Sequence, residues 1–175
     1  MAKKTAVLAV NPVNGSGLFQ YLESFYENNV PFTVFAVADT KEITTNSGIE
    51  LVADKVIADL KGIEDEYEAL VFACGDAMPM FNENADKKYN RDLMEVISVF
   101  GKKKKFIIGH CVGGLLFDLA GIAAGKKLAL HPFVKSAVNT AVATDEDYVV
   151  DGNFFTAKNE NSLNKLIDKV VDVLK

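Results

Sequence analysis

The chain has few of the residues that would build a disulfide-rich, metal-binding or membrane protein. Cys74 and Cys111 are the only cysteines among 175 residues, which excludes a disulfide framework. The two histidines, His110 and His131, lie outside any cluster with metal-ligand spacing, so we expect no metal and no cofactor. The apolar run 6–10 is too short for a signal peptide, and no run is long enough to span a membrane. These absences predict a soluble cytoplasmic protein.

An excess of positive charge is also missing. Lysine and arginine number 19 against 24 aspartate and glutamate residues, which gives a net charge of −5 and a pI near 5.1. This balance argues against a nucleic acid or an anionic membrane as partner. The one basic run, residues 102–105, is typical of a solvated connection. We therefore expect a small-molecule or peptide substrate.

Strand-like and helix-like hydrophobic patterns alternate along the chain. Continuous apolar runs typical of buried parallel strands lie at residues 5–10, 32–38, 69–73 and 105–109. Helical spacing is found at residues 18–28, 86–100 and 163–174. Shorter elements are expected as two extended arms around a turn at 46–48, a helix at 55–60 and a hairpin turning at 151–153. The alternation predicts a single α/β domain over residues 1–175, a three-layer sandwich around a mostly parallel sheet.

Residues 109–113, Gly-His-Cys-Val-Gly, are the most informative stretch of the sequence. They place a cysteine between two glycines where an apolar strand gives way to a helix, which is the pattern of a nucleophile elbow. Because the chain must turn sharply there, Cys111 is expected to have a strained backbone. Unpaired amides and the dipole of the following helix would favour the thiolate. We predict a reactive Cys111, against the alternative of a buried cysteine at a tight turn.

Loops that follow the predicted strands are expected to meet at one edge of the sheet. The first loop, residues 11–17, contains Asn14 as a candidate pocket residue. It has no P-loop lysine and no dinucleotide fingerprint, which favours a tight connection over a phosphate-binding loop. The second loop follows Cys74, and the Gly75 amide could form an oxyanion hole with the Val112 amide of the elbow.

Other pocket candidates differ in how they would reach the Cys111 sulfur. His131 follows a strand, so it would lie at the same sheet edge as a base or orienting partner. His110 adjoins Cys111, but side chains alternate along a strand, so it is expected to face away from the thiol. Asp76 is a further candidate. Cys74 would be a redox partner if the loops converge; the alternative is two cysteines that never react together.

Four segments, in order, resemble a known family. They are similar to a Y-D-x-x-V-x-P-G-G strand and loop, a cysteine elbow, an L-A-x-A-G-L-L-x-G-K segment and a V-V-D-G-N-x-x-T/S hairpin, at residues 67–75, 106–114, 119–126 and 149–156. Over nearly its whole length the chain therefore resembles the ThiJ/PfpI family, the DJ-one-like branch of the glutamine-amidotransferase-like superfamily. The resemblance implies a flavodoxin-like sandwich, a homodimer and a reactive elbow cysteine.

The chain departs from the family's pattern around that cysteine. Peptidase-like members place histidine directly after it, where this chain has Val112. Many members hydrogen-bond the cysteine with a glutamate from the loop after the first strand, a position that falls near Gly17 here. The acid of the peptidase-type triad falls near Pro79, with Asp76 and Glu83 the nearest carboxylates. A Cys-His-Glu peptidase mechanism is therefore not expected.

Three functions remain open. In the first, a cysteine-dependent hydrolase or glyoxalase/deglycase-like enzyme, Cys111 attacks a carbonyl and His131 moves protons. In the second, a redox or stress-response protein, Cys74 resolves a sulfenic acid on Cys111. The third is a non-catalytic small-molecule-binding dimer, which Val112 and the missing acids favour. The first ranks narrowly ahead because a strained elbow is costly to keep without chemistry.

Overall fold

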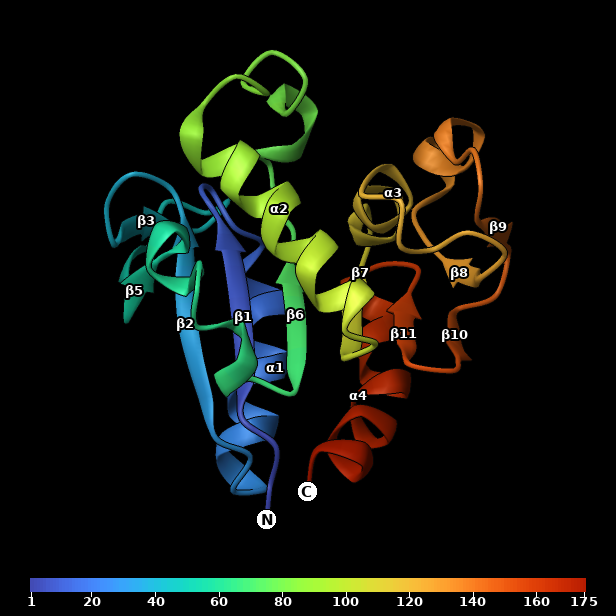
Figure 1. The fold of residues 1–175 in the computed structure, drawn as a ribbon, viewed down its shortest axis with the longest axis horizontal. Coiled ribbons are helices and arrows are strands. Elements are labelled where there is room, and N and C mark those ends of the chain that lie inside the picture. The colour runs from blue at the N-terminus through green and yellow to red at the C-terminus, as the bar shows by residue number, and fades with distance from the viewer.

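A central sheet of seven strands organises the computed structural model, which describes residues 1–175 (Figure 1). The strands are β1 (Thr5–Val10), β2 (Phe32–Val37), β5 (Lys55–Val56), β6 (Ala69–Ala73), β7 (Phe106–His110), β10 (Tyr148–Asp151) and β11 (Phe154–Ala157). They lie in the order β10-β11-β7-β6-β1-β2-β5, and only the β10–β11 pair is antiparallel. β1, buried along its whole length, sits near the middle.

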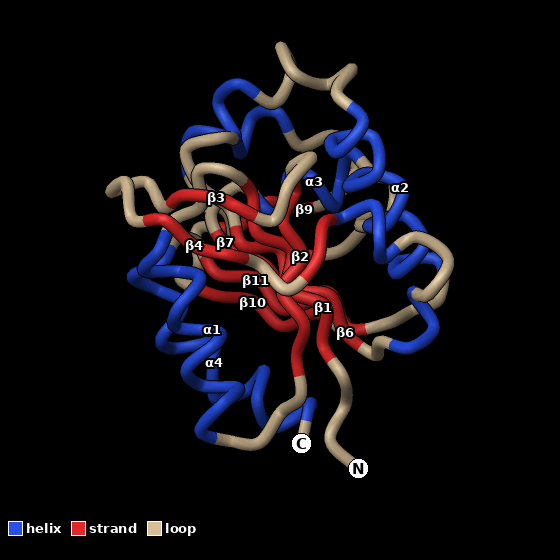
Figure 2. Tube along the Cα trace, turned by 90° about the vertical axis from the view of Figure 1, so that its left-hand side faces the viewer, coloured by secondary structure: helices blue, strands red, loops and turns tan.

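Helices cover both faces of this sheet, which completes a three-layer, flavodoxin-like α/β sandwich. Figure 2 shows α1 (Gly15–Glu27) and α4 (Glu160–Leu174) on one side, and α2 (Lys88–Lys102) and α3 (Gly113–Leu119) on the other. Small elements outside the sheet are the pairs β3 (Glu42–Thr44) with β4 (Glu50–Val52) and β8 (Lys127–Ala129) with β9 (Val142–Thr144), and the 3-10 helices η1 (Ile57–Leu60), η2 (Glu64–Glu66), η3 (Met78–Met80) and η4 (Pro132–Ala137). None of the helices has the length and apolar character needed to cross a membrane.

Local sequence signals explain most element boundaries. α1 begins at Gly15, three residues before the predicted start, because the Asn14 side chain accepts a hydrogen bond from the Gly17 N–H at 2.7 Å and caps the helix. The turn at 46–48 does join two short arms, β3 and β4. The predicted helix at 55–60 is only half correct, because its first two residues pair with β2 as β5 and only the rest form η1.

The pairing of β6 with β7 determines which loop residues meet. These strands run parallel, with Ala69 beside Phe106 and Phe72 beside Gly109. The same register, continued two residues past the last pair, places Cys74 opposite Cys111. Neighbouring strands are about 4.8 Å apart, so the loop after β6 delivers one cysteine directly alongside the other.

Candidate functional site

Cys111 lies in a sharp turn between β7 and α3, as the elbow pattern predicts. Its φ is +58°, a left-handed conformation that costs a residue other than glycine about 1–3 kcal/mol. Two distant segments hold the turn: the Cys111 N–H donates to the Ala157 carbonyl at 3.1 Å, and the Cys111 carbonyl accepts from the His131 N–H at 2.9 Å. A Cβ at Gly109 would lie 2.9 Å from the Phe117 ring, so this flanking glycine is needed for close packing of α3.

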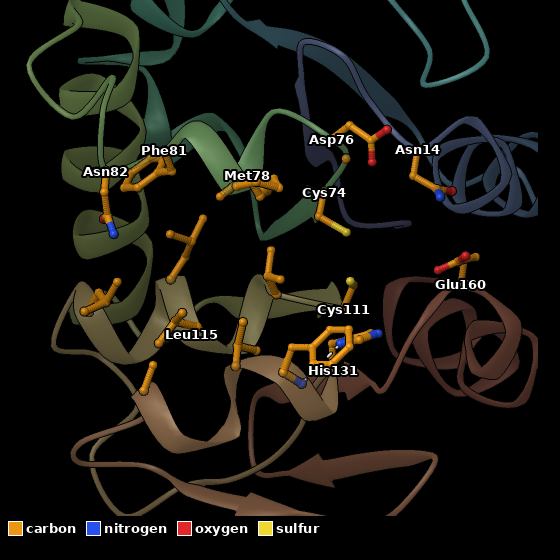
Figure 3. Close-up of a pocket in the computed structure, with 18 of the residues that line it drawn as sticks. Asn14, Cys74, Asp76, Met78, Phe81, Asn82, Cys111, Leu115, His131 and Glu160 are labelled. Atoms are coloured by element: carbon orange, nitrogen blue, oxygen red, sulfur yellow. Dashed lines mark hydrogen bonds between the residues drawn. The ribbon is translucent and has the colours of Figure 1, made fainter.

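The elbow opens onto a pocket of about 650 Å³. Apolar side chains form much of its lining, including Met78, Phe81, Leu115, Leu116, Phe133 and Val134. Figure 3 shows the polar side chains of Asn14, Asp76 and Glu160 on the side of the pocket where the two cysteines lie. No lysine or arginine lines the pocket, although two carboxylates do. The site therefore suits an uncharged or cationic ligand with an apolar part.

The two cysteines face each other across the pocket (Figure 3). Cys74 is buried and Cys111 half-buried, and both are free thiols. The Cys74 thiol, helped by the Val112 N–H, lowers the pKa of Cys111, while burial and the negative charge of Glu160 act in the opposite direction. The interaction with Cys111, together with burial, raises the pKa of Cys74 well above its usual range. Cys111 is thus the thiol that ionises first, which leaves the Cys74 thiol protonated beside it.

His110 lies behind this pair and does not line the pocket, which corrects its assignment as a pocket residue. Its Nε2 is 3.4 Å from the Cys74 sulfur, and its Nδ1 is 3.1 Å from the Tyr21 hydroxyl. Burial lowers the pKa of His110 to about 4, so the ring is neutral at pH 7. A Cβ at Gly17 would lie 2.4 Å from Nε2. The imidazole therefore fills the space that any side chain at position 17 would need.

His131 lines the pocket as predicted, but its ring makes no hydrogen bond to either cysteine. The ring Nδ1 accepts from the Phe133 N–H at 3.3 Å and caps η4. His131 contacts the elbow through its main chain, because its N–H donates a hydrogen bond to the Cys111 carbonyl. Because Nδ1 accepts a hydrogen bond, the neutral ring carries its proton on Nε2 and can serve as a donor.

The predicted oxyanion donors lie on the two loops that converge at the sulfur atoms. The Gly75 N–H makes no hydrogen bond within the chain, and the Val112 N–H lowers the pKa of both cysteine thiols. Asn14 has its Oδ1 committed to the helix cap. Asp76 is tethered through its main chain, whose N–H donates to the Asn46 Oδ1 at 3.0 Å, and its carboxylate stays available to the pocket.

Glu160 is the pocket residue that the sequence analysis missed. It is the first residue of α4, and its negative charge raises the pKa of both cysteines. By sequence it resembles any acidic residue in a first helical turn, where acids are common for reasons of helix stability. The available signal was topological: β11 runs parallel to β7, so the residues that follow β11 must reach the same sheet edge as the elbow.

Comparison with known proteins places this arrangement in a family. The sequence model of the DJ-1/PfpI family matches residues 3–173, so the chain belongs to this family. It is 60% identical over 175 residues to Protein ppBat of Bacteroides thetaiotaomicron, with 100% of both chains covered. The crystal structure of the "putative protease I" from Bacteroides thetaiotaomicron is 60% identical, with a TM-score of 0.99 and coverage of 99% of this chain and 100% of that chain. The crystal structure of Drosophila melanogaster DJ-1beta is 18% identical, with a TM-score of 0.84 and coverage of 99% of this chain and 91% of that chain. This likeness supports the fold alone.

Proposed function

We propose that this protein is a cysteine-dependent enzyme that acts on a small, uncharged carbonyl compound in a hydrolase or glyoxalase-like reaction. The observation that carries the proposal is the Cys111 thiol, whose lowered pKa and strained elbow position it as a nucleophile facing the pocket. A peptidase is not proposed, although a relative carries that name, because Val112 occupies the place of the peptidase histidine and the His131 ring is not bonded to the thiol.

The pocket supplies the parts that such a reaction needs. The Cys111 thiolate attacks the carbonyl carbon, a C–S bond forms, and the electron pair of the carbonyl moves onto oxygen. The Val112 and Gly75 amides stabilise that oxyanion. Glu160 is the candidate proton acceptor because it is close enough to act on the thiol electrostatically. His131 is the candidate proton donor through Nε2.

Turnover of a small substrate panel tests this function. We expect methylglyoxal, phenylglyoxal or an uncharged ester to be converted, because each presents an uncharged carbonyl to the thiolate. Glyoxylate should react poorly because it brings a carboxylate toward Asp76 and Glu160. Product formation is followed by chromatography. No turnover of any uncharged member, with ligand binding retained, would instead favour a non-catalytic binding module.

The acidic pocket also predicts a charge preference at Cys111 itself. Iodoacetamide and iodoacetate have nearly the same shape but differ by one negative charge. We expect the ratio of the iodoacetamide rate to the iodoacetate rate to be higher for Cys111 than for free cysteine, since the Glu160 carboxylate repels the anionic reagent at short range. Glu160→Gln should lower this ratio by at least about threefold. Glu83→Gln is the matched control because it removes one charge outside the pocket lining. Equal narrowing in both variants would show a net-charge effect and contradict the assignment of Glu160.

The pairing of the two cysteines favours a second candidate function, oxidant sensing. Peroxide would oxidise the Cys111 thiolate to sulfenic acid, and the Cys74 thiol would then displace water to form a disulfide. The register that sets these residues opposite each other across adjacent strands is compatible with disulfide geometry. The expected cytoplasmic location and the expected homodimer stay predictions, and sedimentation equilibrium would test the homodimer.

Mild peroxide treatment is expected to remove two hydrogens from the protein and link the Cys74 and Cys111 peptides. Mass spectrometry before and after reduction measures both changes, and Cys74→Ser provides the control because it leaves Cys111 without a resolving thiol. Sulfinic acid on Cys111, with Cys74 still reduced, would exclude the resolving role.

A further inference from the structure

A row of polar side chains runs through the core from α1 to the elbow. It starts at the Tyr21 hydroxyl, which is 3.1 Å from His110 Nδ1, and continues from His110 Nε2 to the Cys74 sulfur at 3.4 Å. The Cys74 sulfur in turn faces Cys111 (Figure 3). Tyr21, His110 and Cys74 are buried, so water does not satisfy their polar groups. Neither proposed chemistry requires Tyr21 or His110.

The partners of these groups determine the direction of each hydrogen bond. His110 Nδ1 is the only hydrogen-bond partner of the Tyr21 hydroxyl, so Tyr21 must donate its hydrogen to that nitrogen or leave a buried donor unpaired. A neutral imidazole whose Nδ1 accepts must carry its hydrogen on Nε2. His110 therefore donates to the Cys74 sulfur. This leaves the Cys74 S–H available to the Cys111 sulfur that faces it. All donors point one way, an arrangement in which each hydrogen bond strengthens the next.

We propose that Tyr21, His110 and Cys74 form a hydrogen-bond relay that stabilises the Cys111 thiolate. The three are positioning residues, since none of them needs to touch a substrate. Gly17 is part of the same arrangement because any Cβ there would collide with His110 Nε2. The relay opposes Glu160, the charged group that faces Cys111 from α4 and disfavours its ionisation.

The test is the pH dependence of Cys111 alkylation by iodoacetamide, which needs no substrate and is independent of the proposed enzymatic function. The rate follows the thiolate fraction, so its midpoint reports the acidity of Cys111. We expect Cys74→Ala to raise the midpoint by about one pH unit, a tenfold loss of thiolate at low pH. Tyr21→Phe removes one hydroxyl and should raise it by a smaller amount. Tyr67→Phe is the matched control, since Tyr67 is equally buried outside the relay, and should leave the midpoint unchanged.

A double-mutant cycle separates a relay from a general loss of packing. Tyr21 can act on Cys111 only through Cys74, so Tyr21→Phe should cause no further shift once Cys74→Ala is present. Additive shifts, or a Tyr21→Phe midpoint equal to that of the wild type, would overturn the proposal. Thermal unfolding confirms that each variant is folded. If Cys74→Ala fails to fold, Tyr21→Phe against Tyr67→Phe decides the outcome alone.

Discussion

Replacing Cys111 with serine is expected to lower kcat/KM for the best uncharged carbonyl substrate by at least about a thousandfold. Serine keeps the shape of the side chain, but its hydroxyl stays protonated at any working pH. The Cys74 thiol and the Val112 N–H can stabilise an existing anion, yet neither can remove a proton from an alcohol. Glu160, the candidate proton acceptor, is a carboxylate and is far too weak a base to ionise an alcohol. His131 cannot replace it as the base, because its acceptor nitrogen caps η4.

The measurement compares steady-state kinetics of the wild type and Cys111→Ser on the same substrate panel. Thermal unfolding of the variant provides the control, and its midpoint should stay close to that of the wild type because serine faces the same backbone strain at φ +58°. Peroxide should also leave the variant without a linkage between the two loops. If Cys111→Ser retained a tenth of the activity, the reaction would have to take place elsewhere in the molecule.

Gly75→Ala is expected to destabilise the protein by about 3 kcal/mol or more, a large effect for one methyl group. A Cβ at this position would lie 2.3 Å from the Pro12 carbonyl oxygen and 2.5 Å from the Val13 Cα. Both contacts are with main chain, which cannot rotate away as a side chain does. The loop after β1 and the loop after β6 would have to separate, and the pocket edge they form would open.

Urea unfolding measures this change, with Gly114→Ala as the matched control. Gly114 also lies beside the site, but its added Cβ would find its nearest neighbour at an ordinary 3.5 Å and would favour the helix. We expect this control to be neutral or slightly stabilising. Equal free energies of unfolding for Gly75→Ala and Gly114→Ala would contradict this prediction. They would mean that the loops after β1 and β6 can move apart at little cost.

Much of the fold is predictable from the sequence because its signals are local or repeat along the chain. The apolar run at residues 5–10 can be satisfied only by burial on both faces, and the structure places it as a central strand. The elbow is predictable for a similar reason, since its two glycines are required by close packing. A Cβ at Gly109 would lie 2.9 Å from the Phe117 ring, and one at Gly113 would lie 3.3 Å from the Phe72 ring. The residues at 55–56 were misassigned because a two-residue strand has no periodicity to detect.

The site was only partly predictable, because its remaining groups depend on side-chain direction and strand order. The alternation of side chains along a strand correctly predicts that His110 faces away from Cys111. It does not predict that the His110 ring forms a hydrogen bond with the Tyr21 hydroxyl on the other side of the sheet. Glu160 required knowledge that β11 lies next to β7, a pairing between segments far apart in sequence. Conversely, the register of β6 and β7 would have paired Cys74 with Cys111 had the strand order been known.

The fit between Gly17 and His110 limits how a sequence of this kind can change. Glutamate at position 17 and imidazole at position 110 compete for one volume, so we expect the two positions to covary among relatives, with a small residue at one wherever the other is large. A lineage that passes from one arrangement to the other by single substitutions has to lose the imidazole before it gains the glutamate. In between, neither an imidazole nor a carboxylate would fill the space beside Cys74.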